Sequence, residues 1–228
     1  MFKTETHLHT SEVSRCGKLT AAEMVERYHA AGYRTIFVTD HFQQKTINKW
    51  IEARGEMTWA EIVAHFKTGW AAAKAAGEPL GMTVLLSAEL RLNESRNHYL
   101  LYGELDDAFF LDRPDMLELS IADFHAYAAS RGVIVVQAHP LRDGKNLPTP
   151  KHVDGMEIYN PNPRHVNFDD AVEAIARFHV LPMTGGSDAH RPEDVAGSGV
   201  LTAEPILTPG DYIEALRGGK FEIIRTRT

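Results

Sequence analysis

Short apolar runs rich in β-branched residues alternate along the chain with segments whose apolar residues recur at helical spacing. This alternation is typical of β/α units arranged around a parallel sheet. Seven such runs predict strands, over residues 3–9, 35–39, 82–88, 99–103, 133–137, 155–159 and 180–184. The pattern therefore predicts an α/β fold.

Capping residues mark where the helices between these strands begin. A Ser or Thr oxygen can accept a hydrogen bond from a free amide of the first turn, and an acid three residues later can return the interaction. This pattern occurs at Thr20 with Glu23 and Thr58 with Glu61, and with a shorter acid at Ser120 with Asp123 and Asn167 with Asp170. Gly32 is predicted to end the first helix and Pro209 to open the last one.

Three polar segments interrupt this alternation, over residues 42–57, 91–97 and 141–152. Each follows directly after a histidine or glutamate at the end of a predicted strand. In a β/α barrel, the loops that follow the strands surround the mouth of the active site. We therefore expect these three segments to frame a substrate pocket.

Length and charge narrow the class of protein. A chain of 228 residues can fill one core, so residues 1–228 are predicted to form a single domain. The net charge of -7 and pI of about 5.9 make long nucleic acid an unexpected partner, although bound cations would reverse the field inside a pocket. With one cysteine, no secretion signal and no apolar run near about 20 residues, a cytoplasmic protein that does not contact a membrane is predicted. The oligomeric state is not indicated.

Metal-binding residue types stand at the ends of the predicted strands. His7 and His9 are two positions apart, so on a strand both side chains lie on the same face. Imidazole and carboxylate groups suit zinc, manganese and iron. The full set, which would hold two or three divalent ions if it converges, is His7, His9, His41, Glu89, His98, His139, Asp188 and His190.

Each of these residues also has a structural interpretation when taken alone. Asp40 with His41 is compatible with a turn or helix cap, His98 with an ordinary strand edge, and the GGSDAH segment with a structural turn. A buried Glu89 would cost several kcal/mol unless a cation or hydrogen bonds compensate it. The separate interpretations would all have to hold independently, whereas one metal cluster explains every placement together.

The motifs HLH, TDH, AHP and GSDAH, with Glu89 and His98 between them, occur in the order of the polymerase and histidinol phosphatase (PHP) family, which the chain resembles from His7 to His190. The resemblance implies a distorted seven-stranded β/α barrel with up to three divalent ions. It places His7, His9, Glu89 and Asp188 around one ion and Glu89 and His139 on the second. His41, His98 and His190 would complete the second and third.

The chain departs from this family pattern near its N-terminus. Many members carry an Asp five residues after the second histidine, where this chain has Ser14. Glu12 is the nearest carboxylate and is included as a candidate ligand, so occupancy of the third metal site depends on where Glu12 points. Cys16 lies in the same loop and its thiolate could bind zinc, but a lone cysteine is more often a packing residue, and it is left out of the ligand set.

The resulting prediction is a metal-dependent phosphoesterase acting on a small phosphorylated metabolite of the nucleotide, sugar phosphate or histidinol phosphate type, through a hydroxide that bridges two ions. His190 and His41 are the candidate general acids. Arg15, Arg91 and Arg142 are candidates for binding the substrate phosphate, although solvated loop arginines are an equal alternative.

Other roles and other classes of function also follow from the sequence. Glu157 and Asn160 are expected to support ligands or to meet substrate. A PHP-type nuclease acting on DNA or short oligonucleotides is the alternative, but it predicts a basic track that the sequence lacks. A non-enzymatic scaffold, which would keep the barrel but lose its metal ligands, is disfavoured because the set of candidate ligands is nearly complete. The histidines expected at the surface or in packing are His29, His65, His125, His152, His165 and His179.

Overall fold

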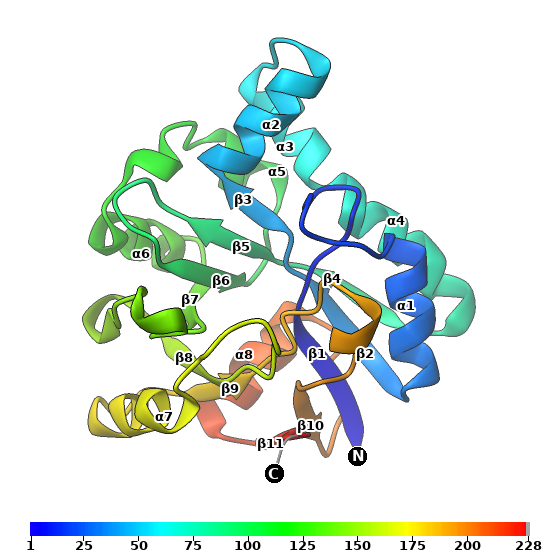
Figure 1. Ribbon diagram of the computed structural model, residues 1–228, viewed down its shortest axis with the longest axis vertical. Helices are drawn as coiled ribbons and strands as arrows, with labels where there is room; N and C mark the ends of the chain where they lie inside the picture. The colour runs from blue at the N-terminus through cyan, green and yellow to red at the C-terminus, as the bar shows by residue number, and fades with distance from the viewer. Residues whose placement is uncertain (227–228) are drawn as a thin grey trace.

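The computed structural model describes residues 1–226 as a mixed α/β fold in which eleven strands form two hydrogen-bonded sheets (Figure 1). In order across the first sheet lie β11 (Phe221–Ile223), β10 (Val200–Thr202), β1 (Phe2–Leu8), β2 (Tyr33–Val38) and β4 (Thr83–Leu86). Across the second lie β3 (His41–Gln43), β5 (Ala88–Arg91), β6 (His98–Tyr102), β7 (Ile134–Ala138), β8 (Gly155–Tyr159) and β9 (Met183–Gly185).

The two sheets meet at two places. β2 is followed almost at once by β3, and β4 by β5, and backbone hydrogen bonds run across both junctions from Glu89 N to Asp40 O and from Ser87 N to Val38 O. On the other side, Leu8 and Ala189 form an isolated parallel bridge. The first sheet therefore contacts the second where β2 and β4 lead into β3 and β5, and again where the end of β1 lies beside the segment after β9.

All seven predicted strand segments contain a strand, whereas β3, β5, β10 and β11 were not expected as separate elements. The expectation of a parallel sheet is wrong for β6, which runs antiparallel to both β5 and β7. The connection over residues 92–97 has no helix, and a connection this short can join only antiparallel neighbours. His98, at the start of β6, consequently lies at the same edge as Glu89 in β5.

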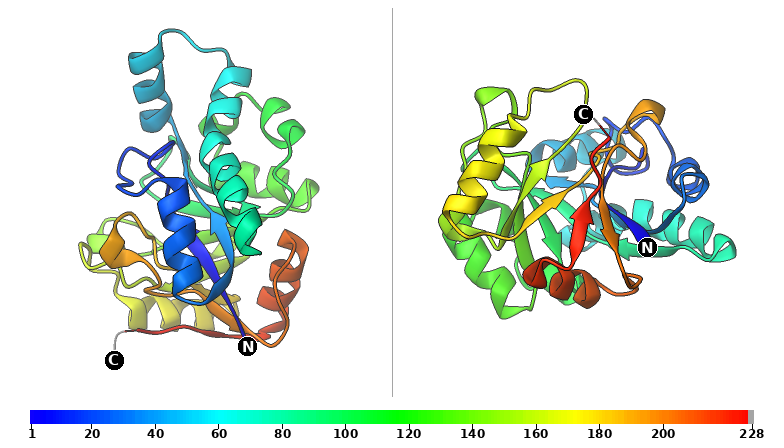
Figure 2. Two further views of the ribbon diagram at one scale, coloured as in Figure 1. Left: turned by 90° about the vertical axis from the view of Figure 1, so that its right-hand side faces the viewer. Right: turned by 90° about the horizontal axis from the view of Figure 1, so that it is seen from below.

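Eight α-helices pack against these sheets within residues 1–226. They are α1 (Ala21–Ala30), α2 (Gln44–Arg54), α3 (Trp59–Phe66), α4 (Thr68–Gly77), α5 (Asp107–Leu111), α6 (Ile121–Ser130), α7 (Asp169–Phe178) and α8 (Pro209–Gly218). Figures 1 and 2 show α1 and α4 beside the first sheet, α6 and α7 outside the second, and α8 across the end where the chain termini lie. None of the helices in the described part of the chain is long and apolar enough to cross a membrane.

The predicted caps at Thr20, Thr58 and Ser120 are confirmed, and Pro209 begins α8 as expected. The predicted cap at Asn167 is wrong. The residue before α7 is instead Phe168, in the left-handed conformation with φ 53° and no side-chain cap.

Asn167 has a different role because its amide group lies inside the fold. Its nitrogen donates to Asn160 O at 2.6 Å, and its oxygen accepts from Arg142 Nε at 3.1 Å. Both partners lie in loops that border the candidate ligands. Asn167 therefore joins two loops of the site instead of starting a helix.

Three clusters of buried apolar side chains hold the layers together. One lies between the first sheet, α1 and α4, and a second lies between the second sheet and helices that include α6 and α7. The third contains Phe37, Tyr102 and Tyr212, whose rings contact one another beneath the candidate ligands. This packing fixes the strand ends on which the candidate ligands stand.

Candidate metal centre

Glu89 lies at the centre of the candidate ligands and is almost fully buried, with 1% of its surface exposed. Its carboxylate oxygens lie 2.7 Å from His41 Nδ1, 2.8 Å from His98 Nδ1 and 2.8 Å from His139 Nε2. These histidines come from β3 and β6, which flank the β5 strand of Glu89, and from the end of β7, the next strand of the same sheet.

A second set of donor atoms joins the two ends of the chain. His7 Nε2 and His9 Nε2 lie 3.2 Å apart, and Asp188 Oδ1 lies 3.3 and 3.2 Å from them respectively. The oxygens of Glu89 lie 3.6 Å from His7 Nε2 and 3.4 Å from His9 Nε2. Donor atoms of a tetrahedral site with bonds of about 2.0–2.1 Å stand about 3.3 Å from one another. These separations therefore match a site for one small divalent cation.

A third set consists of three imidazoles. His9, His41 and His190 each offer a ring nitrogen, and these atoms lie within 4.8 Å of one another. The His9 ring centroid lies 4.4 Å from that of His41 and 4.3 Å from that of His190. The structure thus brings all eight of the predicted strand-end residues together, and their binding of metal stays a prediction.

Two buried atoms in the cluster lack a hydrogen-bond partner, and a bound cation would be expected to contact such atoms. Glu89 Oε2 and His41 Nδ1 are both buried and form no hydrogen bond, although they lie only 2.7 Å apart. A buried polar atom without a partner costs about 1–3 kcal/mol, and more if it is charged. A cation between a carboxylate and an imidazole would satisfy both atoms, so the residues fit a metal ion.

The protonation of two histidines also suits a cation. Burial lowers the pKa of His9 well below its usual value, and the neighbouring His190 and His41 lower it further. Burial, followed by the charge of Arg142, lowers the pKa of His139 to about 4. Both imidazoles are therefore neutral at pH 7 and have a lone pair to offer, as metal binding requires.

The two carboxylates remain charged in spite of their burial. Burial acts to raise the pKa of Glu89, but His98 and His41 hold it well below its usual value. The pKa of Asp188 is likewise held low against burial, mainly by Arg142, whose Nη2 lies 2.6 Å from Asp188 Oδ2. The cluster therefore presents two buried negative charges.

Glu157 in β8 orients two of the ligands, as the sequence predicted for a supporting role. Its Oε1 lies 2.9 Å from His7 Nδ1, while its Oε2 accepts from the backbone N of His139 and from Asn160 Nδ2, both at 2.9 Å. A carboxylate on the outer nitrogen of a ligating histidine fixes the ring and raises its basicity. Glu157 is thus placed to hold His7 with Nε2 facing the cluster.

The backbone is strained where ligands are presented. His139 and Asp188 have positive φ values of 30° and 49°, conformations that cost side-chain-bearing residues about 1–3 kcal/mol and that gather at functional sites. Gly186, directly after β9, allows this segment to approach β1, because a Cβ there would lie 2.5 Å from the Cβ of His7 and 2.7 Å from Glu157 Oε1.

Glu12 does not join the other donors, which corrects its inclusion as a ligand. Both of its carboxylate oxygens accept from the backbone N of Ala21, at 2.9 and 3.0 Å, at the start of α1. A carboxylate is stabilised there by the free amides and by the helix dipole. The carboxylate of Glu12 is therefore held at the helix terminus.

Ser14 belongs to a network that the sequence did not indicate. Its hydroxyl donates to Asp40 Oδ1 at 2.7 Å, accepts from the backbone N of His41 at 3.0 Å, and lies 3.5 Å from His9 Nδ1. Asp40 also accepts from Thr10 N and Thr10 Oγ1. Burial raises the pKa of Asp40 to about 6 although these hydrogen bonds oppose the rise. The network fixes His9 and His41 from behind.

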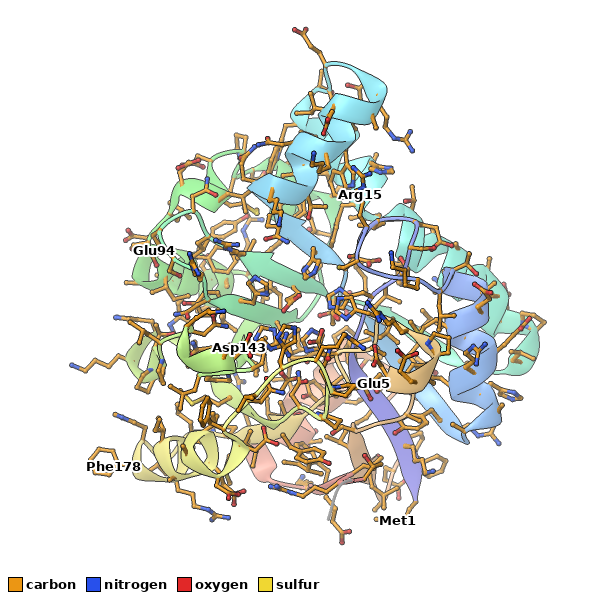
Figure 3. All side chains as sticks on the ribbon, in the orientation of Figure 1. Met1, Glu5, Arg15, Glu94, Asp143 and Phe178 are labelled. Carbon is orange, nitrogen blue, oxygen red and sulfur yellow. The ribbon has the colours of Figure 1, made fainter. Side chains whose placement is uncertain are left out.

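Another buried carboxylate, Glu5, lies close to the cluster but is occupied (Figure 3). It accepts hydrogen bonds from the backbone N of His7 and of Ser187 at 2.8 and 3.0 Å, and from Tyr28 OH at 2.7 Å. Glu5 therefore ties the first strand to the GGSDAH segment instead of offering a ligand.

The cluster opens into a cavity of about 310 Å³ lined by the candidate general acids His41 and His190 and by Arg142. Burial acts to lower the pKa of His41, but Glu89 raises it more, so this pKa lies well above its usual value. Burial likewise acts to lower the pKa of His190, and Asp188 raises it above its usual value. A separate cavity of about 840 Å³ is bordered by α7, α8 and β11, and none of the eight candidate ligands lines it.

The three candidate phosphate-binding arginines divide into two groups. Arg142 is already bound to Asp188, whereas Arg15 and Arg91 line a neighbouring cavity that touches the metal cluster at His41, His98 and Cys16.

Cys16 is exposed, and it lines the metal cavity together with His41 and His190. Partial burial raises the pKa of this thiol and the two histidines lower it more, to about 6. Cys16, which was not predicted to be a ligand, thus lies beside the candidate ligands where the cluster opens to the cavity.

Several residues of the cavity were missed. Asn146 Nδ2 lies 3.5 Å from His139 Nδ1, Arg96 and Lys145 line the metal cavity, and His165 stands at its rim with Nδ1 3.0 Å from Asp143 Oδ2. Arg96, Lys145 and Asn146 lie in the segments 91–97 and 141–152 that were expected to frame a pocket. The polar composition of these segments predicted where the pocket lies but could not indicate which residues within them line it.

Comparisons with known proteins show what this chain is similar to. The PHP-associated family model matches residues 170–221, which include β9 and the GSDAH motif. No curated protein matches the chain at a significant level.

Solved structures show the fold. A two-domain protein from Bacteroides vulgatus containing a predicted PHP-like metal-dependent phosphoesterase has a TM-score of 0.72 at 16% identity, covering 98% of this chain and 64% of that chain. PsfC from Pseudomonas syringae has a TM-score of 0.67 at 19% identity, covering 99% and 91%. The lesion-specific endonuclease EndoQ from Pyrococcus furiosus has a TM-score of 0.58 at 14% identity, covering 97% and 57%.

The chain thus spans less than two thirds of the length of the first and the last of these proteins. The family model matches residues 170–221 and the solved structures share the fold, so together with the ordered motifs they show that this chain is similar to the PHP family.

Proposed function

We propose that this chain is a divalent-metal-dependent phosphoesterase that hydrolyses a phosphate ester of a small phosphorylated metabolite. The observation that carries the proposal is the buried carboxylate of Glu89, which has histidine nitrogens from four strands around it and one oxygen without a hydrogen bond. Such an arrangement is costly for stability alone. Bound cations of zinc, manganese or iron would remove that cost.

The three sets of donor atoms define the proposed ligands of two or three ions. The first set is His7, His9, Glu89 and Asp188; the second is Glu89, His41, His98 and His139; the third is His9, His41 and His190. When bound there, divalent cations supply an activated water molecule and neutralise charge on the phosphate.

We also propose that the two sheets are parts of one distorted seven-stranded β/α barrel formed by a single domain over residues 1–228. β2 with β3, and β4 with β5, would each count as one interrupted strand, because backbone hydrogen bonds continue across both junctions. The bridge between Leu8 and Ala189 would close the barrel. This arrangement supports the proposed function by bringing residues from both ends of the chain to one rim.

When two ions are bound and the third set holds no metal, His190 is better placed than His41 to hold a proton for the departing oxygen. His190 Nδ1 lies 2.8 Å from the backbone O of Asp188, which leaves Nε2 directed elsewhere. His41 Nδ1 instead faces Glu89. The two side chains are similarly exposed, at 12% for His190 and 13% for His41, and both line the cavity, so their orientation alone separates them.

The purified protein with added manganese, zinc or iron should release phosphate from p-nitrophenyl phosphate, and a chelator should abolish the release until metal is added back. A panel of nucleotides, sugar phosphates and histidinol phosphate then identifies the substrate class. Failure to hydrolyse any monoester with any of the three metals would refute the proposal. Because one structural neighbour is an endonuclease, a short oligonucleotide belongs in the panel, and its preferential cleavage would assign the nuclease alternative.

A further inference from the structure

Building on the proposed phosphoesterase function, we propose that a basic cavity beside the metal cluster binds a second anionic group of the substrate. The preferred substrate is then a phosphate monoester whose leaving group carries a further phosphate. Neither the metal cluster nor the family motifs include the cations that form this cavity, so it adds a specificity site to the proposed reaction centre.

The cavity has a volume of about 530 Å³ and adjoins the metal cavity, since both are lined by His41, His98 and Cys16. A substrate held with one phosphate at the metal cluster can therefore reach into it. The volume suits a small group, and a folded macromolecule could not enter.

Four cations from three separate parts of the chain line this cavity. Arg15 lies on the loop between β1 and α1, next to β3 and α2 in Figure 3. Lys45 and Lys49 lie one turn apart on α2, and Arg91 ends β5. Because residues four apart on a helix share one face, both lysines of α2 are presented toward the same side.

These cations are poorly neutralised by the protein. No Asp or Glu lines the cavity. Among the described residues 1–226, no carboxylate forms an ion pair with Arg15, Lys45 or Arg91, whereas Lys49 pairs with the exposed Glu52 at 2.5 Å. Glu52 is also influenced by Arg15, as the lowering of its pKa by Lys49 and then Arg15 shows. Glu52 thus offsets the charge of Lys49 and part of that of Arg15, and no ion pair within residues 1–226 offsets Lys45 or Arg91.

This concentration of positive charge is unexpected in a chain with a net charge of -7. Like charges gathered around a concave surface repel one another and raise the local concentration of anions. A bound dianion would remove the repulsion. The cations are also chemically suited to phosphate, because a guanidinium offers two parallel donors and lysines add point charges.

The cavity is distinct from the place of the phosphate that is cleaved. Inside the metal cavity, Arg142 is held by Asp188 and Asn167, and the cluster itself is directed at that phosphate. Arg91 is oriented by a hydrogen bond from its Nε to the backbone O of Ser95 at 3.1 Å, which leaves its terminal nitrogens for another partner. We therefore assign Arg15 and Arg91 to the second anionic group.

The test compares monophosphates and bisphosphates of linear alkanediols of three to six carbons, which differ only in the second phosphate. For the manganese-loaded protein, kcat/KM for the best bisphosphate should exceed that for its monophosphate by about tenfold or more. Lys45→Gln and Arg91→Gln should each lower kcat/KM for the bisphosphate about tenfold more than for the monophosphate. Lys151→Gln and Arg34→Gln, exposed cations outside both cavities, should change neither value.

Equal losses on both substrates, or the absence of any preference for bisphosphates, would overturn the proposal. Preference for the dinucleotide pTpT over every alkanediol bisphosphate would overturn it in favour of a nucleic-acid subsite. If the full panel of monoesters is also not hydrolysed, the proposed function fails, and the subsite is then tested by calorimetric titration of pentane-1,5-bisphosphonate against pentylphosphonate. The subsite would be supported if the wild type binds the bisphosphonate tenfold more tightly than pentylphosphonate and Lys45→Gln abolishes this difference. Equal affinities of the wild type for the two compounds would refute it.

Discussion

Replacement of Glu89 by glutamine gives the most direct test of the metal cluster. The substitution keeps the shape of the side chain and one oxygen but removes the charge that faces His41, His98 and His139 at 2.7–2.8 Å. If this carboxylate is shared by two cations, Glu89→Gln removes a negative charge from both at once. The expected result is loss of metal together with loss of phosphatase activity.

The magnitude follows from the electrostatics of a partly buried site. Two unit charges 4 Å apart attract each other by about 4 kcal/mol at an effective dielectric constant near 20. Each 1.4 kcal/mol is about tenfold in a dissociation constant. The amide oxygen of glutamine keeps part of the interaction, so we expect metal affinity to fall by about a hundredfold to a thousandfold.

Glu12→Gln provides a matched control, because Glu12 was the other glutamate expected among the ligands. Its carboxylate caps α1, and the amide can still accept from Ala21 N. We expect unchanged metal content and a stability loss of about 0.3–1 kcal/mol from the weaker interaction with the helix dipole.

Metal content after gel filtration is measured by mass spectrometry, and zinc affinity by competition with a chromophoric chelator. Circular dichroism checks that both variants fold. If Glu89→Gln binds as much metal as the wild type with the same affinity, or if Glu12→Gln loses as much as Glu89→Gln, the assignment of Glu89 as the shared ligand is wrong.

Two further predictions concern groups around the ligands. Glu157→Gln should weaken metal binding about 10–100-fold, because Glu157 orients His7 through its outer nitrogen at 2.9 Å; an unchanged affinity in the chelator competition would contradict that role. Burial raises the pKa of Asp169 to about 6 from a reference value of 3.8, so its favourable contribution is complete below about pH 4 and is lost as pH rises through 6. The free energy of unfolding of Asp169→Asn, relative to that of the wild type, should therefore be higher at pH 7 than at pH 4. The full shift corresponds to about 3 kcal/mol, but partial exposure reduces the expected gain to about 1 kcal/mol. Urea unfolding at the two pH values measures it, and a relative gain at pH 4 would contradict the sign.

Much of the local structure could be predicted because its causes are local. The boxes at Thr20 and Thr58 formed as expected, since both partners lie within one helical turn. The cap at Asn167 failed because its amide found partners in Asn160 and Arg142, which no local pattern indicates. The antiparallel course of β6 was missed for a similar reason, as alternating strands and helices suggested a crossover where the chain makes a short turn.

The sequence by itself determined which donors stand at strand ends, because strand periodicity and residue chemistry are properties of short segments. Only the tertiary structure decided where those donors point. Glu12 and Ser14 lie two positions apart, yet one caps a helix and the other joins Asp40 behind two histidines. The basic cavity likewise needs Arg15 and Arg91 in one place, and such contacts depend on how the two sheets meet.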